Sequence, residues 1–216
     1  MSRFTVIDAE QRSEAWFAAR AGRLTGSRAA DMLATIKSGE AAVRRDYRLQ
    51  LVTERLTGQP DEGGYVNADM QRGIDLEPAA FAAYEALTGQ MVQRSGFLLS
   101  TDHQAGCSLD GHVGEFEGIV ELKVPRSATH LRYLRAVGLL PEHAAQVWHN
   151  LWITGAAWCD FFSFDPRFPE PLQTFRVRVY QESVRLSDYE KKALAFLAEV
   201  DAETVAVRAM ADAVVR

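Results

Sequence analysis

Two acidic residues and a lysine have the types and spacing of a metal-dependent hydrolytic site. Asp110 precedes the triplet Glu121-Leu122-Lys123. If Asp110 and Glu121 end neighbouring strands, their carboxylates converge, while Lys123 projects from the same strand face as Glu121. Two carboxylate oxygens can hold Mg²⁺ or Mn²⁺ with open positions for water and phosphate, and a nearby ammonium can stabilise charge or help activate the attacking water. The pattern is typical of phosphodiester hydrolysis.

Each half of this pattern also has a simpler interpretation. Glu121 and Lys123 alone could form an exposed salt bridge on a strand, and Asp110-Gly111 is a strong hairpin-turn signal. However, the residues around Glu121 are apolar, and Pro125 ends the run. A charged pair in such a strand is costly unless something compensates for its burial. We therefore favour a metal site, in which a turn holds Asp110 at the strand end.

Two further residues could complete this site. Glu77 lies in a predicted helix, where its carboxylate could support the metal-bound water, although it could equally be an ordinary exposed acid. Pro78 follows it directly, and proline disturbs the helical geometry of the preceding residue. Gln146 lies among apolar residues of another predicted helix, so we expect it to face the site rather than water.

A third feature suits a phosphate group. Arg20 and Ser27 lie on either side of a glycine-bearing turn ahead of a predicted helix. A helix start with serine and arginine offers backbone N–H groups and positive charge to a phosphate. The alternative is a helix cap beside a surface arginine.

The elements that must position these residues follow from the hydrophobic pattern. Helical spacing predicts helices in the first half at residues 13–20, 27–36, 40–56 and 68–87, with a kink or a late start at Pro78, and later helices at residues 128–136, 141–154 and from Ser187 onward. Short apolar or alternating runs predict strands of one sheet at residues 97–99, 105–109, 118–124, 157–164 and 174–180. We therefore predict an α/β fold, with a central mixed sheet flanked by helices, a helical N-terminal region and a C-terminal helix.

Composition limits the protein class. The 216 residues suit a single domain spanning 1–216. The net charge of −5 argues weakly against a protein that coats nucleic acid. It does not argue against an enzyme that passes nucleic acid through a local basic groove. The candidate basic clusters are Arg20, Arg23 and Arg28, and then Lys37, Arg44, Arg45 and Arg48. No apolar run approaches the roughly 20 residues that span a bilayer, and no export signal is visible, so we expect no membrane and a cytoplasmic location.

The two cysteines, Cys107 and Cys159, are flanked by apolar or small residues. We expect both to be buried free thiols. Two cysteines are also too few for a four-cysteine iron–sulfur cluster, so we expect none.

Taken together, these motifs give the chain a family resemblance. Between Trp16 and Arg167 it is similar to phage lambda exonuclease and the lambda-type viral recombinase nucleases of the PD-(D/E)xK superfamily. The shared motifs, in chain order, are Trp16…Arg20-x-Gly22-x-Leu24-Thr25-x-Ser27, Gly73…Glu77, Ser108-x-Asp110-Gly111, Glu121-Leu122-Lys123-x-Pro125, Ala145-Gln146-Val147 and Asp165-Pro166-Arg167. Together they are highly specific, whereas each alone is not.

The resemblance implies a restriction-endonuclease-like core and a processive exonuclease that digests one strand of linear double-stranded DNA from 5′-phosphorylated ends, 5′ to 3′. It also implies a ring-shaped homotrimer around the DNA, phage-type homologous recombination with a single-strand annealing recombinase, and a phage or prophage gene in a bacterial host.

The resemblance also assigns roles to residues. Asp110, Glu121 and the Leu122 carbonyl would hold Mg²⁺, with Mn²⁺ as a possible substitute, and Lys123 would assist the nucleophilic water. Glu77 and Gln146 would complete the site. Arg20 and Ser27 would bind the 5′ phosphate of the DNA end. Met70 would help to separate the last base pairs, and Lys37 would contact the DNA. A restriction-like endonuclease on the same core and a DNA-binding module with a decayed site are the alternatives.

Overall fold

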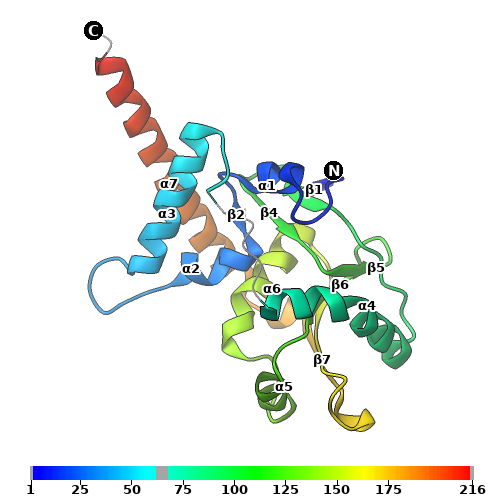
Figure 1. Ribbon diagram of the computed structural model, residues 1–216. Helices are drawn as coiled ribbons and strands as arrows, with labels where there is room; N and C mark the ends of the chain where they lie inside the picture. Colours follow the sequence, from blue (N-terminus) through cyan, green and yellow to red (C-terminus); the bar gives the residue numbers. More distant parts are fainter. Residues whose placement is uncertain (1, 62–67, 215–216) are drawn as a thin grey trace.

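The computed structural model describes residues 2–61 and 68–214. In this part of the chain, helices pack around two four-stranded sheets (Figure 1). The first elements are β1 (Phe4–Ile7), α1 (Glu14–Arg20), β2 (Leu24–Thr25), the short 3₁₀ helix η1 (Gly26–Arg28), α2 (Ala29–Leu33), α3 (Ala42–Thr57) and α4 (Ala68–Thr88). The later elements are β3 (Phe97–Ser100), β4 (Ala105–Ser108), β5 (Gly111–Val113), β6 (Gly118–Lys123), α5 (Ser127–Leu134), α6 (Pro141–Thr154), β7 (Trp158–Phe164), η2 (Glu170–Leu172), β8 (Thr174–Tyr180), η3 (Gln181–Ser183) and α7 (Leu186–Val214).

Both sheets are mixed. The first has the order β1-β3-β4-β2, in which β3 pairs antiparallel with β1 and β4, while β2 runs parallel to β4. The second has the order β5-β6-β7-β8. Its inner pair, β6 and β7, is parallel, and the outer strands β5 and β8 are antiparallel to their neighbours.

The prediction that the strands form one sheet is wrong, because the chain changes sheets at Asp110. Ser108 ends β4 in the first sheet, and Gly111 begins β5 in the second. The short strands β1, β2 and β5 were also not predicted, since runs of two to four residues are too short to show an alternating pattern. The change of sheet places Asp110 where the two sheets meet.

The helix predictions in the N-terminal part are largely confirmed. Ser13 caps α1 by accepting a hydrogen bond from the backbone N–H of Trp16, at 3.2 Å. Helix α3 ends at Gly58, whose φ of +68° is the left-handed conformation that favours glycine. Helix α2 is shorter than predicted and ends at Leu33, because Thr35 instead forms an isolated β-bridge with Glu40.

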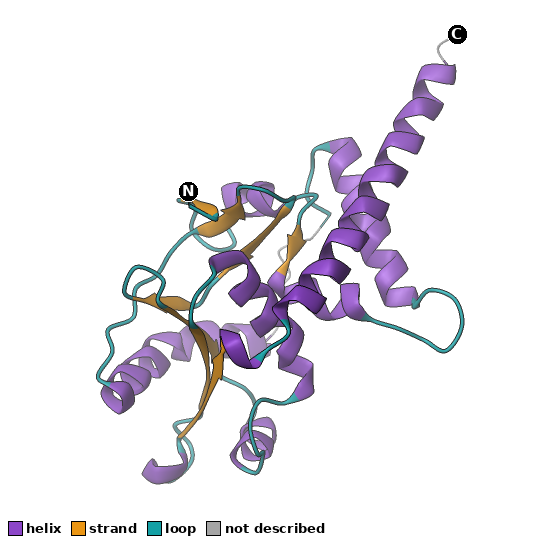
Figure 2. Ribbon diagram, turned by 180° about the vertical axis from the view of Figure 1, so that it is seen from behind, coloured by secondary structure: helices purple, strands orange, loops and turns teal. Residues whose placement is uncertain are grey.

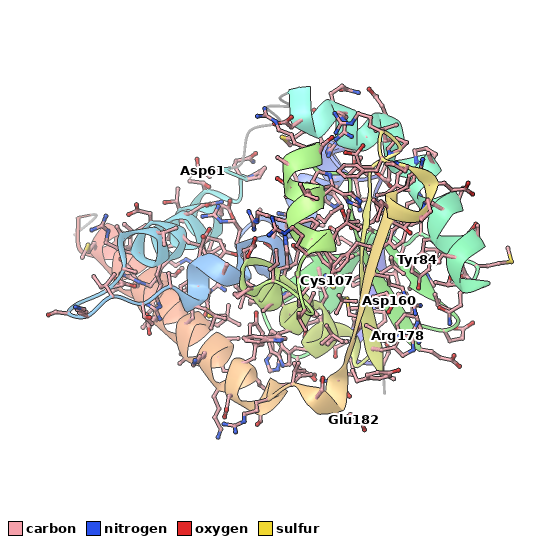
Figure 3. All side chains as sticks on the ribbon, turned by 90° about the horizontal axis from the view of Figure 1, so that it is seen from below. Asp61, Tyr84, Cys107, Asp160, Arg178 and Glu182 are labelled. Carbon is pink, nitrogen blue, oxygen red and sulfur yellow. The ribbon has the colours of Figure 1, made fainter. Side chains whose placement is uncertain are left out.

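Helix α4 begins at Ala68 and runs through Pro78, so of the two predicted outcomes, a kink or a late start, the late start is wrong. It packs against the second sheet, where Tyr84 on α4 donates a hydrogen bond to Asp160 on β7 at 2.8 Å. Arg178 on β8 donates to the same carboxylate (Figure 3). This buried network fixes α4 to the sheet.

Two hydrophobic clusters cover the two faces of the second sheet. The larger cluster includes Ile119, Cys159 and Leu151 of α6, and it continues to α3 and α7. The smaller one, under α4, includes Val120 and Leu122. Because side chains alternate along a strand, Glu121 faces the same side as Ile119, toward α6. Cys107 and Cys159 are buried free thiols, as predicted.

Helix α7 packs along α3, with the rings of Phe196 and Tyr47 stacked at 5.6 Å between centroids. Its C-terminal end projects beyond the rest of the chain (Figures 1 and 2). Among the residues that the structure describes, no helix is both long enough and apolar enough to span a membrane.

Candidate functional site

Asp110 lies against the open edge of β6. The β5–β6 ladder ends where Gly111 pairs with Val120. Beyond that point, the Asp110 carboxylate takes the place of the missing strand and accepts a hydrogen bond from the backbone N–H of Leu122 at 2.6 Å. Since the N–H and C=O of one strand residue point to the same side, the Leu122 carbonyl also points toward this edge.

Glu121 and Lys123 project from one face of β6 and form an ion pair. The Glu121 side chain is only 3 % exposed, and the Lys123 side chain is 29 % exposed. The alternative of an exposed strand salt bridge is therefore wrong. The amide of Asn150 on α6 also donates to Glu121, at 3.2 Å from Nδ2 to Oε2.

Burial controls the protonation of these groups. It raises the pKa of Asp110, and it raises the pKa of Glu121 from its ordinary value of 4.5 to about 7. Burial lowers the pKa of Lys123, but the carboxylates of Glu121 and Asp110 together raise it above its ordinary value. One ammonium therefore serves two buried carboxyl groups. The site lacks one positive charge when both acids are ionised.

The donor atoms at this edge fit a hard divalent cation. The carboxylates of Asp110 and Glu121 and the carbonyl of Leu122 are oxygen ligands, which Mg²⁺ and Mn²⁺ prefer. Among residues 2–61 and 68–214, no three His, Cys, Asp or Glu side chains gather into a group that could hold a metal. A cation here would therefore need the backbone carbonyl, water or substrate oxygens as further ligands.

Glu77 lies near this edge, but its carboxylate is occupied. It forms an ion pair with Arg94, at 2.9 Å from Nη2 to Oε1. Burial raises the pKa of Glu77, although Arg94 opposes the shift. Glu77, Arg94, Arg12 and Asp110 line one cavity of about 720 Å³. The structure thus brings Glu77 into the same cavity as Asp110, turned toward Arg94.

Gln146 lies on α6 beside Glu121. A hydrogen bond between the side chains of Gln146 and Glu121 lowers the pKa of Glu121, but burial raises that pKa more strongly. Asn150, which the sequence analysis missed, follows one helical turn later. Residues i and i+4 share a helix face, so the position of Gln146 was a signal that could have found Asn150.

The candidate phosphate site is connected to the acidic site. Arg20 donates a hydrogen bond to the Ser27 hydroxyl at 3.3 Å, and its guanidinium lies 4.1 Å from the ring centroid of Trp16. The Trp16 indole N–H in turn donates to the hydroxyl of Ser108, at 2.8 Å. Ser108 is only two positions before Asp110. Trp16 therefore links the Arg20–Ser27 pair to the strand end that carries Asp110.

The two remaining predicted contacts have exposed side chains. Met70 is a 40 % exposed residue of α4, and Lys37 is exposed between α2 and α3. The predicted basic cluster on α3 is largely neutralised by acids. Its ion pairs are Arg44 with Glu40 and Glu199, Arg45 with Asp46, and Arg48 with Glu40 and Glu203.

Arg72 is a second residue that the sequence analysis missed. It donates to the carbonyls of Pro125 (2.5 Å) and Val124 (3.3 Å), and it pairs with Asp165 at 3.3 Å. Asp165 is fully buried. Burial raises its pKa, but hydrogen bonds from Arg167 and Ser127 hold it well below its ordinary value. This network holds the chain that follows Lys123.

Comparisons with known proteins agree with this architecture. The family described as the YqaJ-like viral recombinase domain matches residues 15–157. A crystal structure of the alkaline exonuclease LHK-Exo from Laribacter hongkongensis is similar, with a TM-score of 0.82 and 37 % identity over 94 % of this chain and 100 % of that chain. A structure of LHK-Exo in complex with dAMP has a TM-score of 0.84 at the same identity and coverage.

A phage-related exonuclease from Haemophilus somnus 129PT is similar in fold alone. Its TM-score is 0.65 at 11 % identity, over 86 % of this chain and 96 % of that chain. A search of curated proteins finds no match. The structural matches confirm the predicted restriction-endonuclease-like α/β core.

Proposed function

Because this chain belongs to the YqaJ-like viral recombinase domain family, we propose that it is a Mg²⁺-dependent exonuclease that digests one strand of linear double-stranded DNA from 5′ to 3′. Relatives at 37 % identity are described as an alkaline exonuclease, which supports a nuclease. In this proposal, a phage or prophage gene encodes the chain, and the exonuclease acts in phage-type homologous recombination in the cytoplasm of a bacterial host. The observation that carries the proposal is the Trp16 link between Arg20 and the strand end at Asp110.

The acidic site suits hydrolysis of a phosphodiester. Asp110, Glu121 and the Leu122 carbonyl would hold the cation, with Mn²⁺ as a possible substitute. A divalent cation there supplies positive charge to the scissile phosphate and polarises water. The Lys123 ammonium, which pairs with Glu121, would hold the attacking water and stabilise the developing negative charge. Gln146 supports Glu121, and Glu77 completes the site when it leaves Arg94.

Arg20 and Ser27 suit the terminal 5′ phosphate. A guanidinium beside a hydroxyl offers charge-assisted hydrogen bonds. Water attacks the phosphorus, and the 3′ oxygen of the terminal nucleotide leaves with a proton, so the remaining strand again carries a 5′ phosphate. Each cut therefore recreates the group that Arg20 binds, which suits repeated cutting in a fixed register.

The remaining assignments complete the proposal. Met70 helps to separate the last base pairs, and Lys37 contacts the DNA. The chain acts as a single domain in a homotrimeric ring. A ring around the DNA explains processive digestion without tight binding. It also accommodates the net charge of −5, because a basic inner lining can coexist with an acidic outer surface. A single-strand annealing recombinase receives the strand that remains.

Digestion of end-labelled linear duplex tests polarity, end requirement and metal dependence together. The substrates carry 5′-phosphate or 5′-hydroxyl ends, with and without Mg²⁺. We expect mononucleotides from the 5′ end, only with the metal, and faster with the phosphate. Cutting of covalently closed circular duplex would instead indicate an endonuclease, and metal-independent binding without hydrolysis would indicate a decayed site.

Arg20→Ala tests the phosphate assignment. Loss of hydrogen bonds to a charged group predicts an approximately 10- to 100-fold decrease in the ratio of rates on 5′-phosphate and 5′-hydroxyl ends. Arg45→Ala is the matched control, because this exposed arginine pairs with Asp46 on the same helix. An equal loss on both kinds of end would contradict a phosphate role for Arg20.

A further inference from the structure

One buried amide lies between Glu121 of the acidic site and Gly26, which precedes Ser27 of the candidate phosphate site. Asn150 on α6 is 1 % exposed. Its Nδ2 donates to Glu121 Oε2 at 3.2 Å. Its Oδ1 is buried without a hydrogen-bond partner among the described residues. Buried acceptors are rarely left unpaired. The unpaired oxygen of Asn150 therefore calls for an explanation from the residues around it.

The unpaired end of the amide lies against the loop that carries Ser27. A Cβ atom added at Gly26 would be 2.4 Å from Asn150 Oδ1, which is well inside van der Waals contact. Gly26 opens η1, and η1 packs against α6. The absence of a side chain at Gly26 therefore allows the loop to rest on the amide oxygen.

The orientation of this amide is determined by its partners. The ionised form of Glu121 only accepts hydrogen bonds, so in that form the NH₂ group of Asn150 faces Glu121 and the amide oxygen faces Gly26. The amide group is planar and rigid. A displacement of the loop at Gly26 is therefore transmitted to the hydrogen bond at Glu121.

We propose that Asn150 is a positioning residue that couples the loop at Gly26 and Ser27 to the orientation of the Glu121 carboxylate. The coupling rests on the proposed function, because it takes Glu121 as a metal ligand and Ser27 as a phosphate contact. Asn150 engages Oε2 and Lys123 engages Oε1 of Glu121, so the two groups together fix the plane of the carboxylate. Each carboxylate oxygen has a second lone pair, which a cation could use. A DNA end that seats correctly on the loop then keeps the metal-binding carboxylate in its working orientation.

Metal binding without DNA tests the first half of this coupling. The thermal unfolding temperature is measured against Mn²⁺ concentration for the wild-type chain, Asn150→Ala and Asn150→Leu, which keeps a similar volume without the amide. Loss of a hydrogen bond that orients a metal ligand predicts a half-stabilising Mn²⁺ concentration about 10- to 100-fold higher in both variants. Thr204→Val is the control, since it removes a buried hydroxyl on α7. An unchanged Mn²⁺ midpoint in both variants, or no Mn²⁺ stabilisation of the wild-type chain, overturns the proposal.

A double-mutant cycle tests the link to the loop. Gly26→Ala drives a methyl group into Asn150 Oδ1. We expect it to raise the Mn²⁺ midpoint in the wild-type background and to change it little in the Asn150→Ala background, where the oxygen is absent. Equal shifts in both backgrounds overturn the link.

These measurements use no DNA, so they are independent of the exonuclease assays. If the wild-type chain binds Mn²⁺ as expected but does not degrade linear duplex, the proposed function fails while the coupling of Asn150 stands.

Discussion

Glu121 and Asp160 are buried acids on the adjacent strands β6 and β7, but they lie on opposite faces of the sheet. Asp160 pairs in register with Val120, so it faces α4, whereas Glu121 faces α6. Asp160 accepts hydrogen bonds from the Tyr84 hydroxyl and from Nε and Nη2 of Arg178, each at 2.8 Å. Both of its oxygens are therefore matched by donors, and a guanidinium balances its charge (Figure 3).

The acidic site at Glu121 is different, because two carboxyl groups share one ammonium. Lys123 forms an ion pair with Glu121, and Asp110 is held by a backbone N–H. Burial accordingly raises the pKa of Glu121 to about 7. The two buried acids therefore differ in charge balance. Asp160 has a donor for each oxygen and a guanidinium beside it, whereas Glu121 and Asp110 share the ammonium of Lys123.

The largest expected effect is on catalysis. Lys123→Ala removes the ammonium that serves the site, so we expect the rate on 5′-phosphorylated linear duplex to fall at least about 1,000-fold. Asp110→Ala should also abolish activity. Lys191→Ala, on the exposed side of α7, is the control. Undiminished activity of Lys123→Ala would contradict the comparison, because Glu121 and its partner would then be no more important for catalysis than Asp160.

The next effect concerns stability. Asp160→Ala leaves Arg178 and Tyr84 without their buried partner, and we expect the free energy of unfolding to fall by about 3 kcal/mol. Urea denaturation measures this. Asp46→Ala, whose partner Arg45 is also exposed, should cost less than about 1 kcal/mol. A similarly small cost for Asp160→Ala would show that its network does not hold α4.

The smallest effect is a pH dependence confined to the acidic site. Because its pKa is raised from 4.5 to about 7 in the fold, Glu121 binds a proton that the unfolded chain has released in this pH window. The stability of the metal-free chain should therefore fall as pH rises from 4.5 to about 7. A cation must displace this proton, so the half-stabilising Mn²⁺ concentration should rise about tenfold for each pH unit below 7.

Thermal unfolding at a series of pH values measures both trends. Glu121→Gln cannot ionise, and it should weaken the stability trend, leaving the contribution of Asp110, whose pKa is also raised by burial. Asp160→Ala should leave both trends intact wherever the variant stays folded. If the trends are undiminished in Glu121→Gln, they arise from another group.

Local signals predicted most of the helices and the residues of the site. Helix ends follow from short-range chemistry: Ser13, at the start of the predicted helix 13–20, caps α1, and Gly58, just after the predicted helix 40–56, ends α3. Asp110, Glu121 and Lys123 were identified by type and spacing, and the structure brings them together on one edge. The transition between sheets at Asp110 was not predictable, because strand pairing depends on which distant strands are free.

The order of residues along the chain already supplies the chemical groups of the candidate site: two acids, a lysine, an arginine and a serine. Which partner each group contacts depends on the packing of distant segments. This packing pairs Glu77 with Arg94, surrounds Asp160 with donors, and rests Gly26 against the amide that holds Glu121. The physical reason is that helix caps and turns arise from neighbouring residues, whereas burial and charge balance arise from residues far apart in the chain.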